Sequence, residues 1–509
     1  MAEYYPRKNM LEFESEVTEE ESKAEDSYLT ILKDVCSHTL PIIAGGTLAV
    51  VSSFGNAVII ASISDDAVKV SGYVSSIKNV LIYPARSVFF SLQPLIGDAY
   101  QKKDFATAGK YWKYSVLLGL ELGLILCLPL MNIDSFLRLT HQNKELSTVT
   151  GEYFRYFAAA IPANMMIEIT NELFITTGNE SLIIPSSFLR FSLELGMNAF
   201  FINYLKMGIH GWALSSLIQP IIYSIILMSY IALSNKFKNL HLFRFNNSNE
   251  NLMQLLNELY HFQKKIMVLG FPVCVQTFGG FGAYFSEVLM LGSMNVNGMI
   301  AFNTSNQWSN WALKIHTSLA TSTSVLISKK LANKELLNAK KVGEIAISAS
   351  GLISIISLII MTFAYKPMTE VLLNPDNDKD KILHYAKIIM PIIGVSTLGF
   401  GIKFIASGAM RGYKDTSTPM LIDVVGTLAG LGVSATLGFA TNMEAIGVAT
   451  GDAFGLMLAG MLLMYFFSME NSKKMDYRFF SYNPLNASSE DNKETNTILD
   501  GESREVQLI

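Results

Sequence analysis

The first candidates for chemistry are ionisable residues inside long apolar stretches of the sequence. The run from Ile266 to Gly292, IMVLGFPVCVQTFGGFGAYFSEVLMLG, carries a single acid, Glu287. A helix needs roughly 20 such residues to cross a bilayer, so this run is long enough. A carboxylate in hydrocarbon is costly unless it is paired, protonated or facing water. Glu287 is therefore a candidate functional-site residue; the alternative is an acid that anchors the helix end at the membrane interface.

Further charged residues lie in other apolar stretches, and their spacing suggests how they group. Glu168 and Glu172 are four apart, on one helical face, where like charges repel. Arg190 and Glu194 are also four apart, and Asn198 lies one turn further on, so the three form a polar stripe that either serves a site or contains a structural ion pair. Four further ionisable residues inside apolar stretches stand out, namely Arg86, Lys314, His316 and Lys403. For His316, a hydrogen-bonded core histidine is as good an interpretation as a ligand contact.

The stretch around Gln307 is unusually polar for a membrane span. It reads AFNTSNQWSNWALKIHTSLATSTSV. Such a helix either packs against its neighbours by hydrogen bonds or lines a solute path. We favour the path, with Arg190, Gln307, Lys314, His316 and Lys403 as candidate solute-contacting residues.

Motifs for other chemistries are missing from the sequence. It has no phosphate-binding G-x-x-x-x-G-K-[ST] loop, no metal-ligand cluster and no nucleophile elbow. The cysteines Cys36, Cys127 and Cys274 lack metal or redox spacing. We therefore expect no enzyme activity, catalytic residue, metal or cofactor other than a coupling ion, H⁺ or Na⁺.

The elements that position these residues are membrane-spanning helices. Half of the residues are hydrophobic and only 16% are charged, against about a quarter charged in soluble domains. Apolar blocks this long are helices rather than barrel strands. The pattern predicts an all-α, multi-pass membrane protein with spans at Thr39–Ser64, Val70–Gln93, Ser115–Asn132, Tyr153–Thr176, Ser181–Tyr204, Gly211–Leu233, Ile266–Gly292, Met299–Ile327, Val342–Phe363, Tyr385–Gly408, Met420–Phe439 and Ala445–Phe467.

These twelve spans divide the chain into five parts. We expect an acidic N-terminal tail (1–38), a first lobe of six helices (39–233), a polar linker (234–265), a second lobe (266–467) and a disordered C-terminal tail (468–509). Basic residues cluster after spans two, six, eight, ten and twelve, which predicts that both termini and the linker are cytoplasmic in a cell membrane.

The two halves repeat each other. PLIGDAYQKKDFATAGK, from Pro94, matches VLISKKLANKELLNAKK, from Val325, at an offset of 231 positions. The same offset places Asn56 on Glu287. Repeats of this kind indicate two lobes related by a pseudo-twofold axis along the membrane normal, with the solute site between them.

Several stretches together resemble the multidrug and toxic compound extrusion (MATE) transporters. They are QPLIGDAY at Gln93–Tyr100, LGFP at Leu269–Pro272 and SGAMRGYKDTSTP at Ser407–Pro419, with shorter matches at Gly211–Leu214 and Ser286–Leu289. The resemblance covers about Thr39 to Phe467. It implies two six-helix lobes in a V shape and alternating access driven by proton or sodium antiport.

The sequence departs from this family at most of its coupling acids. The acid usual late in span one is replaced by Asn56, and the span-five acid has moved by one turn, so that Glu194 and Asn198 stand where the family has Asn and then Asp. Only Glu287 matches a family acid. The resemblance thus leaves Glu287 and Glu194 as the leading ion-coupling candidates, with Asn56, Asn198 and Glu168 beside them.

Three functions fit these observations. The first is a monomeric exporter of small organic solutes or xenobiotics, working by proton- or sodium-coupled antiport. The second is a flippase for lipid-linked precursors in the same superfamily, and the third a receptor or scaffold that kept the fold without transport. Because Lys314 and Lys403 add positive charge, we expect a cavity that is less selective for cations than that of the drug exporters and that accepts anionic or zwitterionic solutes. No nucleic-acid partner is expected.

Overall fold

The computed structural model describes residues 26–139, 144–243, 252–373, 378–441 and 443–470. The predicted acidic tail, up to residue 25, and the predicted disordered tail, from residue 471, lie outside these ranges. Every regular element in the described ranges is helical.

The first half contains six helical rods, several of them interrupted. Rod one is α2 (Tyr28–Ala61), and rod two runs through α3 (Asp65–Ile77), η1 (Lys78–Ile82), α4 (Tyr83–Ser87), η2 (Val88–Ser91) and α5 (Leu92–Gln101). The others are α6 (Phe105–Met131), the pair α8 (Lys144–Ala159) and α9 (Ile161–Thr176), the pair α10 (Ile183–Asn198) and η4 (Ala199–Tyr204), and α11 (Gly208–Leu233). Short helices α7 (Ile133–Leu139), η3 (Glu180–Leu182) and η5 (Asn235–Leu240) connect them.

The second half repeats this plan with longer, less interrupted helices. They are α12 (Leu252–Met294), α13 (Val296–Ala332), α14 (Leu336–Phe363), α16 (Lys379–Gly412), α17 (Ser417–Ala440) and α18 (Glu444–Tyr465), with the short α15 (Tyr365–Glu370) and η6 (Phe466–Glu470). Each predicted span falls on one of the twelve rods in the described ranges. Nine of these helices are long and apolar enough by themselves to cross a membrane. The polar α13 is not among the nine, although it has 37 residues.

Two helices extend beyond their predicted ends. α2 begins at Tyr28 rather than Thr39, because Ser27 caps it by accepting a hydrogen bond from the backbone N–H of Thr30. α12 begins at Leu252, inside the stretch predicted as linker. This extension packs on α6, where Tyr114 donates a 2.9 Å hydrogen bond to Glu258 and stacks on Phe262.

The repeat is visible in the backbone. Lys103 and Lys334, which are 231 positions apart, both adopt the left-handed conformation, with φ of 61° and 66°. In each case the next residue donates a 2.9 Å backbone hydrogen bond back to the helix that has just ended, Asp104 to Ala99 and Glu335 to Lys330. The same turn therefore ends the second helix of each half, although neither turn uses glycine.

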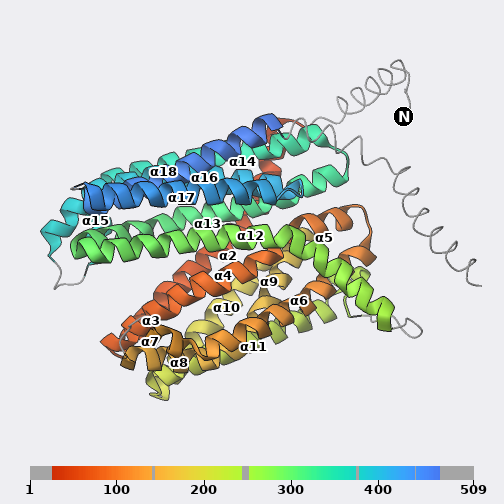
Figure 1. Ribbon diagram of the computed structural model, residues 1–509. Helices are drawn as coiled ribbons and strands as arrows, with labels where there is room; N and C mark the ends of the chain where they lie inside the picture. The colour runs from red at the N-terminus through yellow and green to blue at the C-terminus, as the bar shows by residue number, and fades with distance from the viewer. Residues whose placement is uncertain (1–25, 140–143, 244–251, 374–377, 442, 471–509) are drawn as a thin grey trace, which may run out of the picture.

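The helices form two lobes, and the start of the first helix of each lobe packs into the core of the other. Figure 1 shows the second half, green to blue, on one side of the first half, red to yellow. Yet Ile31 and Val35 of α2 lie in a core built by helices of the second lobe, and Ile266 of α12 lies in the core of the first. Further along, α2 packs on α10 and α12 packs on α17, each within its own lobe.

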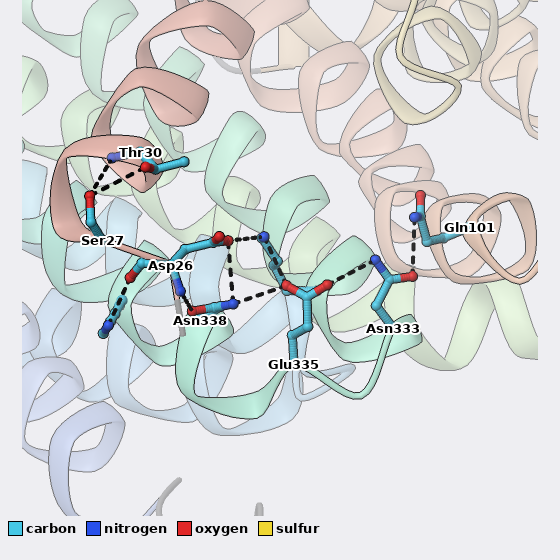
Figure 2. Close-up of polar contacts among 9 residues, drawn as sticks. Asp26, Ser27, Thr30, Gln101, Asn333, Glu335 and Asn338 are labelled. Carbon is cyan, nitrogen blue, oxygen red and sulfur yellow. Dashed lines mark hydrogen bonds and ion pairs between the residues drawn. The ribbon is translucent and has the colours of Figure 1, made fainter. Parts of the chain in front are cut away.

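Polar contacts join the two lobes at one end of the molecule. Lys414 lies 2.7 Å from Asp98, and Gln101 donates a 3.1 Å hydrogen bond to Asn333. Beside them, the backbone N–H of Asp26 donates to Asn338, and the Asp26 carboxylate pairs with Lys330 at 2.7 Å (Figure 2). The loops that follow rod two, α13 and α16, which carry many of the predicted cytoplasmic basic residues, meet at this end.

Candidate ion-coupling and solute site

In the first lobe, Glu194 is held by neutral hydrogen-bond donors. Asn56 Nδ2 donates to one carboxylate oxygen at 2.6 Å, and Ser52 Oγ donates to the other at 3.1 Å. Asn198 Nδ2 in turn donates to Asn56 Oδ1 at 2.7 Å. Three of the residues singled out from the sequence, Asn56, Glu194 and Asn198, thus form one hydrogen-bonded chain between α2 and α10.

Arg190 does not take part in this chain. The alternative interpretation of the stripe was an ion pair between Arg190 and Glu194 along α10. The described residues form no such pair. In the described residues only uncharged groups bond to Glu194, and no cation lies within ion-pair distance of its carboxylate. A carboxylate in this state is suited to taking up and releasing a cation or a proton.

In the second lobe, Glu287 lies in the interior of the bundle. Its side chain is 3% exposed, and no described residue donates a hydrogen bond to it. It is close enough to Asp452 of α18 for the two charges to repel each other. The alternative reading of an anchor at the membrane interface does not fit this burial.

Lys403 lies in the same lobe and already has a partner. Its ammonium is 2.7 Å from Asp423 of α17, and both side chains are nearly inaccessible, at 5% and 3%. It also lies over the rings of Phe400 and Phe404 and within electrostatic range of Asp452. The group therefore contains the acids Glu287, Asp423 and Asp452 for one lysine, which leaves negative charge to be balanced by a proton or a bound cation.

Two of these acids were missed by the sequence interpretation. Asp423 and Asp452 lie within the predicted spans Met420–Phe439 and Ala445–Phe467. The criterion that selected Glu287, an acid inside an apolar stretch, selects both of them when it is applied to every span.

His316 and Glu168 occupy structural positions. His316 is fully buried, with Ser350 Oγ 3.1 Å from Nδ1 and Ser354 Oγ 3.2 Å from Nε2. This is the core-histidine alternative, so His316 has no surface to offer a solute. Glu168 pairs with Arg86, whose Nε donates at 3.0 Å. It is therefore neutralised by its partner and is a weaker coupling candidate than Glu194.

Glu172 is buried, and Gln307 lies on a helix whose polar groups are largely satisfied within the helix itself. Glu172, on the same face as Glu168, is buried and accepts a 3.3 Å hydrogen bond from Gln93. Gln307 is exposed, while several hydroxyls of α13 bond back to carbonyls of their own helix, as Ser305 does to Ala301 at 2.7 Å. Much of the polarity of α13 is thus satisfied locally, which favours helix packing for those residues.

The fold and the charges within the spans together define the class of protein to which this chain belongs. The chain is a multi-pass helical membrane protein with two repeated lobes and a carboxylate without a cationic partner in each. Its sequence matches the MatE family model over residues 41–200 and 272–436, one match in each lobe. The chain belongs to this family of transporters, as its resemblance predicts.

Similar proteins cover most of the chain. A probable multidrug resistance protein NorM of Synechococcus sp. is 20% identical over 440 residues, which are 84% of this chain and 91% of that protein. Protein DETOXIFICATION 17 of Arabidopsis thaliana is 21% identical over 325 residues, 63% of this chain and 65% of its own.

Solved structures show the same fold. The eukaryotic MATE transporter AtDTX14 superposes with a TM-score of 0.78 at 15% identity, covering 87% of this chain and 97% of that one. A MOP superfamily transporter from Pyrococcus furiosus, described as having a binding pocket of reversed polarity, also gives 0.78, at 16% identity and with 87% and 96% covered.

Proposed function

We propose that this protein is a monomeric secondary exporter of small organic solutes, driven by antiport against a proton. The observation that carries the proposal is a carboxylate without a cationic partner in each lobe, Glu194 in the first and Glu287 in the second. Such groups must gain a proton or a cation when water and counter-ions are withdrawn from them. The names of the relatives, which refer to multidrug resistance, support xenobiotics as the solutes.

The contacts between the lobes support alternating access. Asp98–Lys414 and Gln101–Asn333 hold the lobes together at one end, so the solute would reach the interior from the other. The basic residues of the loops at the joined end support a cytoplasmic location for it and for both termini, in a cell membrane. Export then requires that these contacts break so that the lobes can open inward.

Proton coupling is tested with the purified protein in liposomes. A pH gradient should drive uptake of ethidium or fluorescein, a cationic and an anionic dye, whereas a sodium gradient at constant pH should not. We expect Glu194→Gln and Glu287→Gln each to lower pH-driven transport at least tenfold, because the glutamine keeps the hydrogen-bonding shape but cannot titrate. Glu121→Gln, on the exposed face of α6, is the matched control and should transport normally.

Two results would oppose the proposal. One is transport of either dye that does not respond to pH and survives both substitutions. The other is the absence of gradient-driven transport of any small solute, which would favour the receptor or scaffold function. If a sodium gradient alone drives transport, the protein is still an exporter, but the proposed coupling to protons is wrong.

A further inference from the structure

Four of the cations within the predicted spans fall into two pairs with different surroundings. Arg86 is neutralised by Glu168 and Lys403 by Asp423. Arg190 and Lys314 make no ion pair or hydrogen bond with any residue in the described ranges, and both are at least partly accessible. Two uncompensated positive charges in a membrane protein require water or an anionic partner.

Arg190 and Lys314 come from opposite lobes but from helix segments that pack against the same part of α2. Arg190 belongs to α10 of the first lobe and Lys314 to α13 of the second. Gly45 of α2 lies against Ser187, three residues before Arg190, and the adjacent Gly46 lies against Ser318, four residues after Lys314. Both cations also lie within electrostatic range of the Tyr83 hydroxyl. Lys78 is also in range, but it donates a 2.7 Å hydrogen bond to Tyr153 and lies over Phe157. The free positive charge near Tyr83 is therefore that of Arg190 and Lys314.

Tyr83 itself stands at the boundary between the lobes. Its ring stacks on Phe281 of α12, with centroids 5.7 Å apart and planes inclined by 26°. The guanidinium carbon of Arg86 lies over the same Tyr83 ring, 5.4 Å from its centroid. Although it contacts the opposite lobe, the Tyr83 side chain remains 43% exposed. The exposed part of Tyr83 therefore offers aromatic surface at the boundary between the lobes.

We propose that Arg190, Lys314 and the Tyr83–Phe281 pair form the solute site, and that its ligands are aromatic organic anions. The proposal rests on the exporter function above and names its substrate class. A guanidinium binds a carboxylate or sulfonate through two parallel hydrogen bonds, and the lysine adds a point charge. The ligand's ring would stack on Tyr83 or Phe281, since aromatic pairs favour offset or edge contacts.

The positions of the nearby acids agree with a site that binds anions rather than cations. Glu168, the carboxylate partner of Arg86, is already neutralised, and Glu194 points to Asn56 and Ser52 on α2. Neither is available to hold an organic cation beside Tyr83. Because the two cations belong to different lobes, a bound anion would bridge the lobes, and its release would accompany their separation.

Binding of two matched probes tests the proposal on the full-length protein in detergent. 2-Naphthalenesulfonate and trimethyl(2-naphthyl)ammonium have the same ring system and opposite charges, and calorimetry gives a Kd for each. We expect the sulfonate to bind at least tenfold more tightly. Arg190→Gln and Lys314→Gln should each weaken its binding about five- to tenfold, and Tyr83→Leu should weaken both probes. Lys236→Gln, on an exposed connecting segment, is the control and should change neither Kd.

Each outcome bears on the proposal separately from the exporter function. Tighter binding of the ammonium probe, or sulfonate binding that survives the Arg190→Gln/Lys314→Gln double variant, would overturn the anion site. So would the failure of both probes to bind to protein that elutes as a single folded species. The exporter function would stand in all three cases if dye transport still depended on pH, Glu194 and Glu287.

Discussion

At the scale of single residues, two kinds of charge occur within the predicted membrane spans of this protein. Lys403 and Asp423 neutralise each other within the second lobe, whereas Glu194 has hydrogen-bond donors but no cation. A closed ion pair stabilises one arrangement of helices, because neither member can leave without exposing the other. A carboxylate bonded only to amides and hydroxyls can instead change its charge without a partner being stranded.

Removal of one member of the closed pair should destabilise the protein. Lys403→Met leaves Asp423 buried without its cation, and the expected loss is about 3 kcal/mol, the lower range for breaking a buried pair. Thermal unfolding in detergent measures this loss as a lower Tm. The double variant Lys403→Met/Asp423→Leu should recover most of the loss, and Lys381→Met, from an exposed pair, should leave Tm unchanged. A double variant as unstable as the single one would contradict this account.

Asn56 should be required to position Glu194. Its amide donates to Glu194 and accepts from Asn198, so Asn56→Leu leaves both without that partner. We expect a loss of pH-driven dye transport of roughly tenfold, corresponding to about 1.4 kcal/mol. Asn56→Gln should restore part of it. Ser53→Ala, whose hydroxyl bonds only to its own helix, is a neighbouring control that should transport normally. Full transport by Asn56→Leu would show that Glu194 needs no such support.

At the scale of elements, the start of α2 is fastened to the second lobe by a polar clasp, formed by Asp26, Lys330, Glu335, Asn338 and Lys341 (Figure 2). Burial opposes the charge on Lys330, but hydrogen bonds to Asp26 and Glu335 outweigh it and raise its pKa. Burial likewise opposes the charge on Glu335, yet hydrogen bonds from Lys330, Asn338 and Asn333 lower the pKa of this carboxyl.

These shifts fix the pH range in which the clasp holds. The lowered pKa of Glu335 contributes stability that is present above its ordinary value of 4.5 and is lost as the pH falls through the lower folded value. The raised pKa of Lys330 contributes stability that is present below 10.5 and is lost only at still higher pH. We expect α2 to stay fastened between about pH 5 and 10 and to loosen in stronger acid.

Breaking the clasp should loosen the first turns of α2. In Asp26→Ala, Lys330 and Asn338 lose a partner and the connection to the second lobe is weakened. Backbone amides of Thr30–Val35 should then exchange hydrogen several-fold faster at pH 7, as measured by mass spectrometry. Exchange around Asn56, further along α2, should not change. Lys33→Gln, on the exposed face of α2, is the control. Unchanged exchange in Asp26→Ala would mean that Ile31 and Val35 hold the helix start without the clasp.

At the scale of the whole molecule, the joined end should have to open for transport. Gln101 and Asn333 belong to different lobes and are in hydrogen-bond contact. In a variant that lacks the three native cysteines, Gln101→Cys/Asn333→Cys should be linked by a short bismaleimide and lose dye transport. The reagent should have no effect on either single-cysteine variant, which are the controls. Transport that continues after complete linkage would show that the lobes need not separate at this end.

The twelve-span fold can be predicted from the sequence because a helix that crosses a bilayer needs a continuous apolar block of roughly 20 residues. Glu194 and Asn198 were selected by their helical spacing, and Asn56 by its repeat position on Glu287. That Asn56 joins the other two by hydrogen bonds is known only from the structure. Contacts between distant helices do not follow in the same way. Nothing local to Lys403 indicates Asp423 as its partner, and the burial of His316 depends on serines of α14. The start of α2 was missed because the polar residues before Thr39 interrupt the apolar block while still forming helix.

The packing of the start of each first helix into the core of the other lobe has a consequence for biosynthesis. Ile31 and Val35 complete a core that includes Leu319 and residues after it, so α2 enters the membrane long before its neighbours are made. At about 5–20 residues per second, the ribosome needs roughly 15–60 s to reach Leu319. During this interval the first half cannot bury the start of α2 against its final neighbours, and it also lacks Ile266 in its own core. The two halves, synthesised as separate polypeptides, should therefore accumulate only when they are produced together in the same cell.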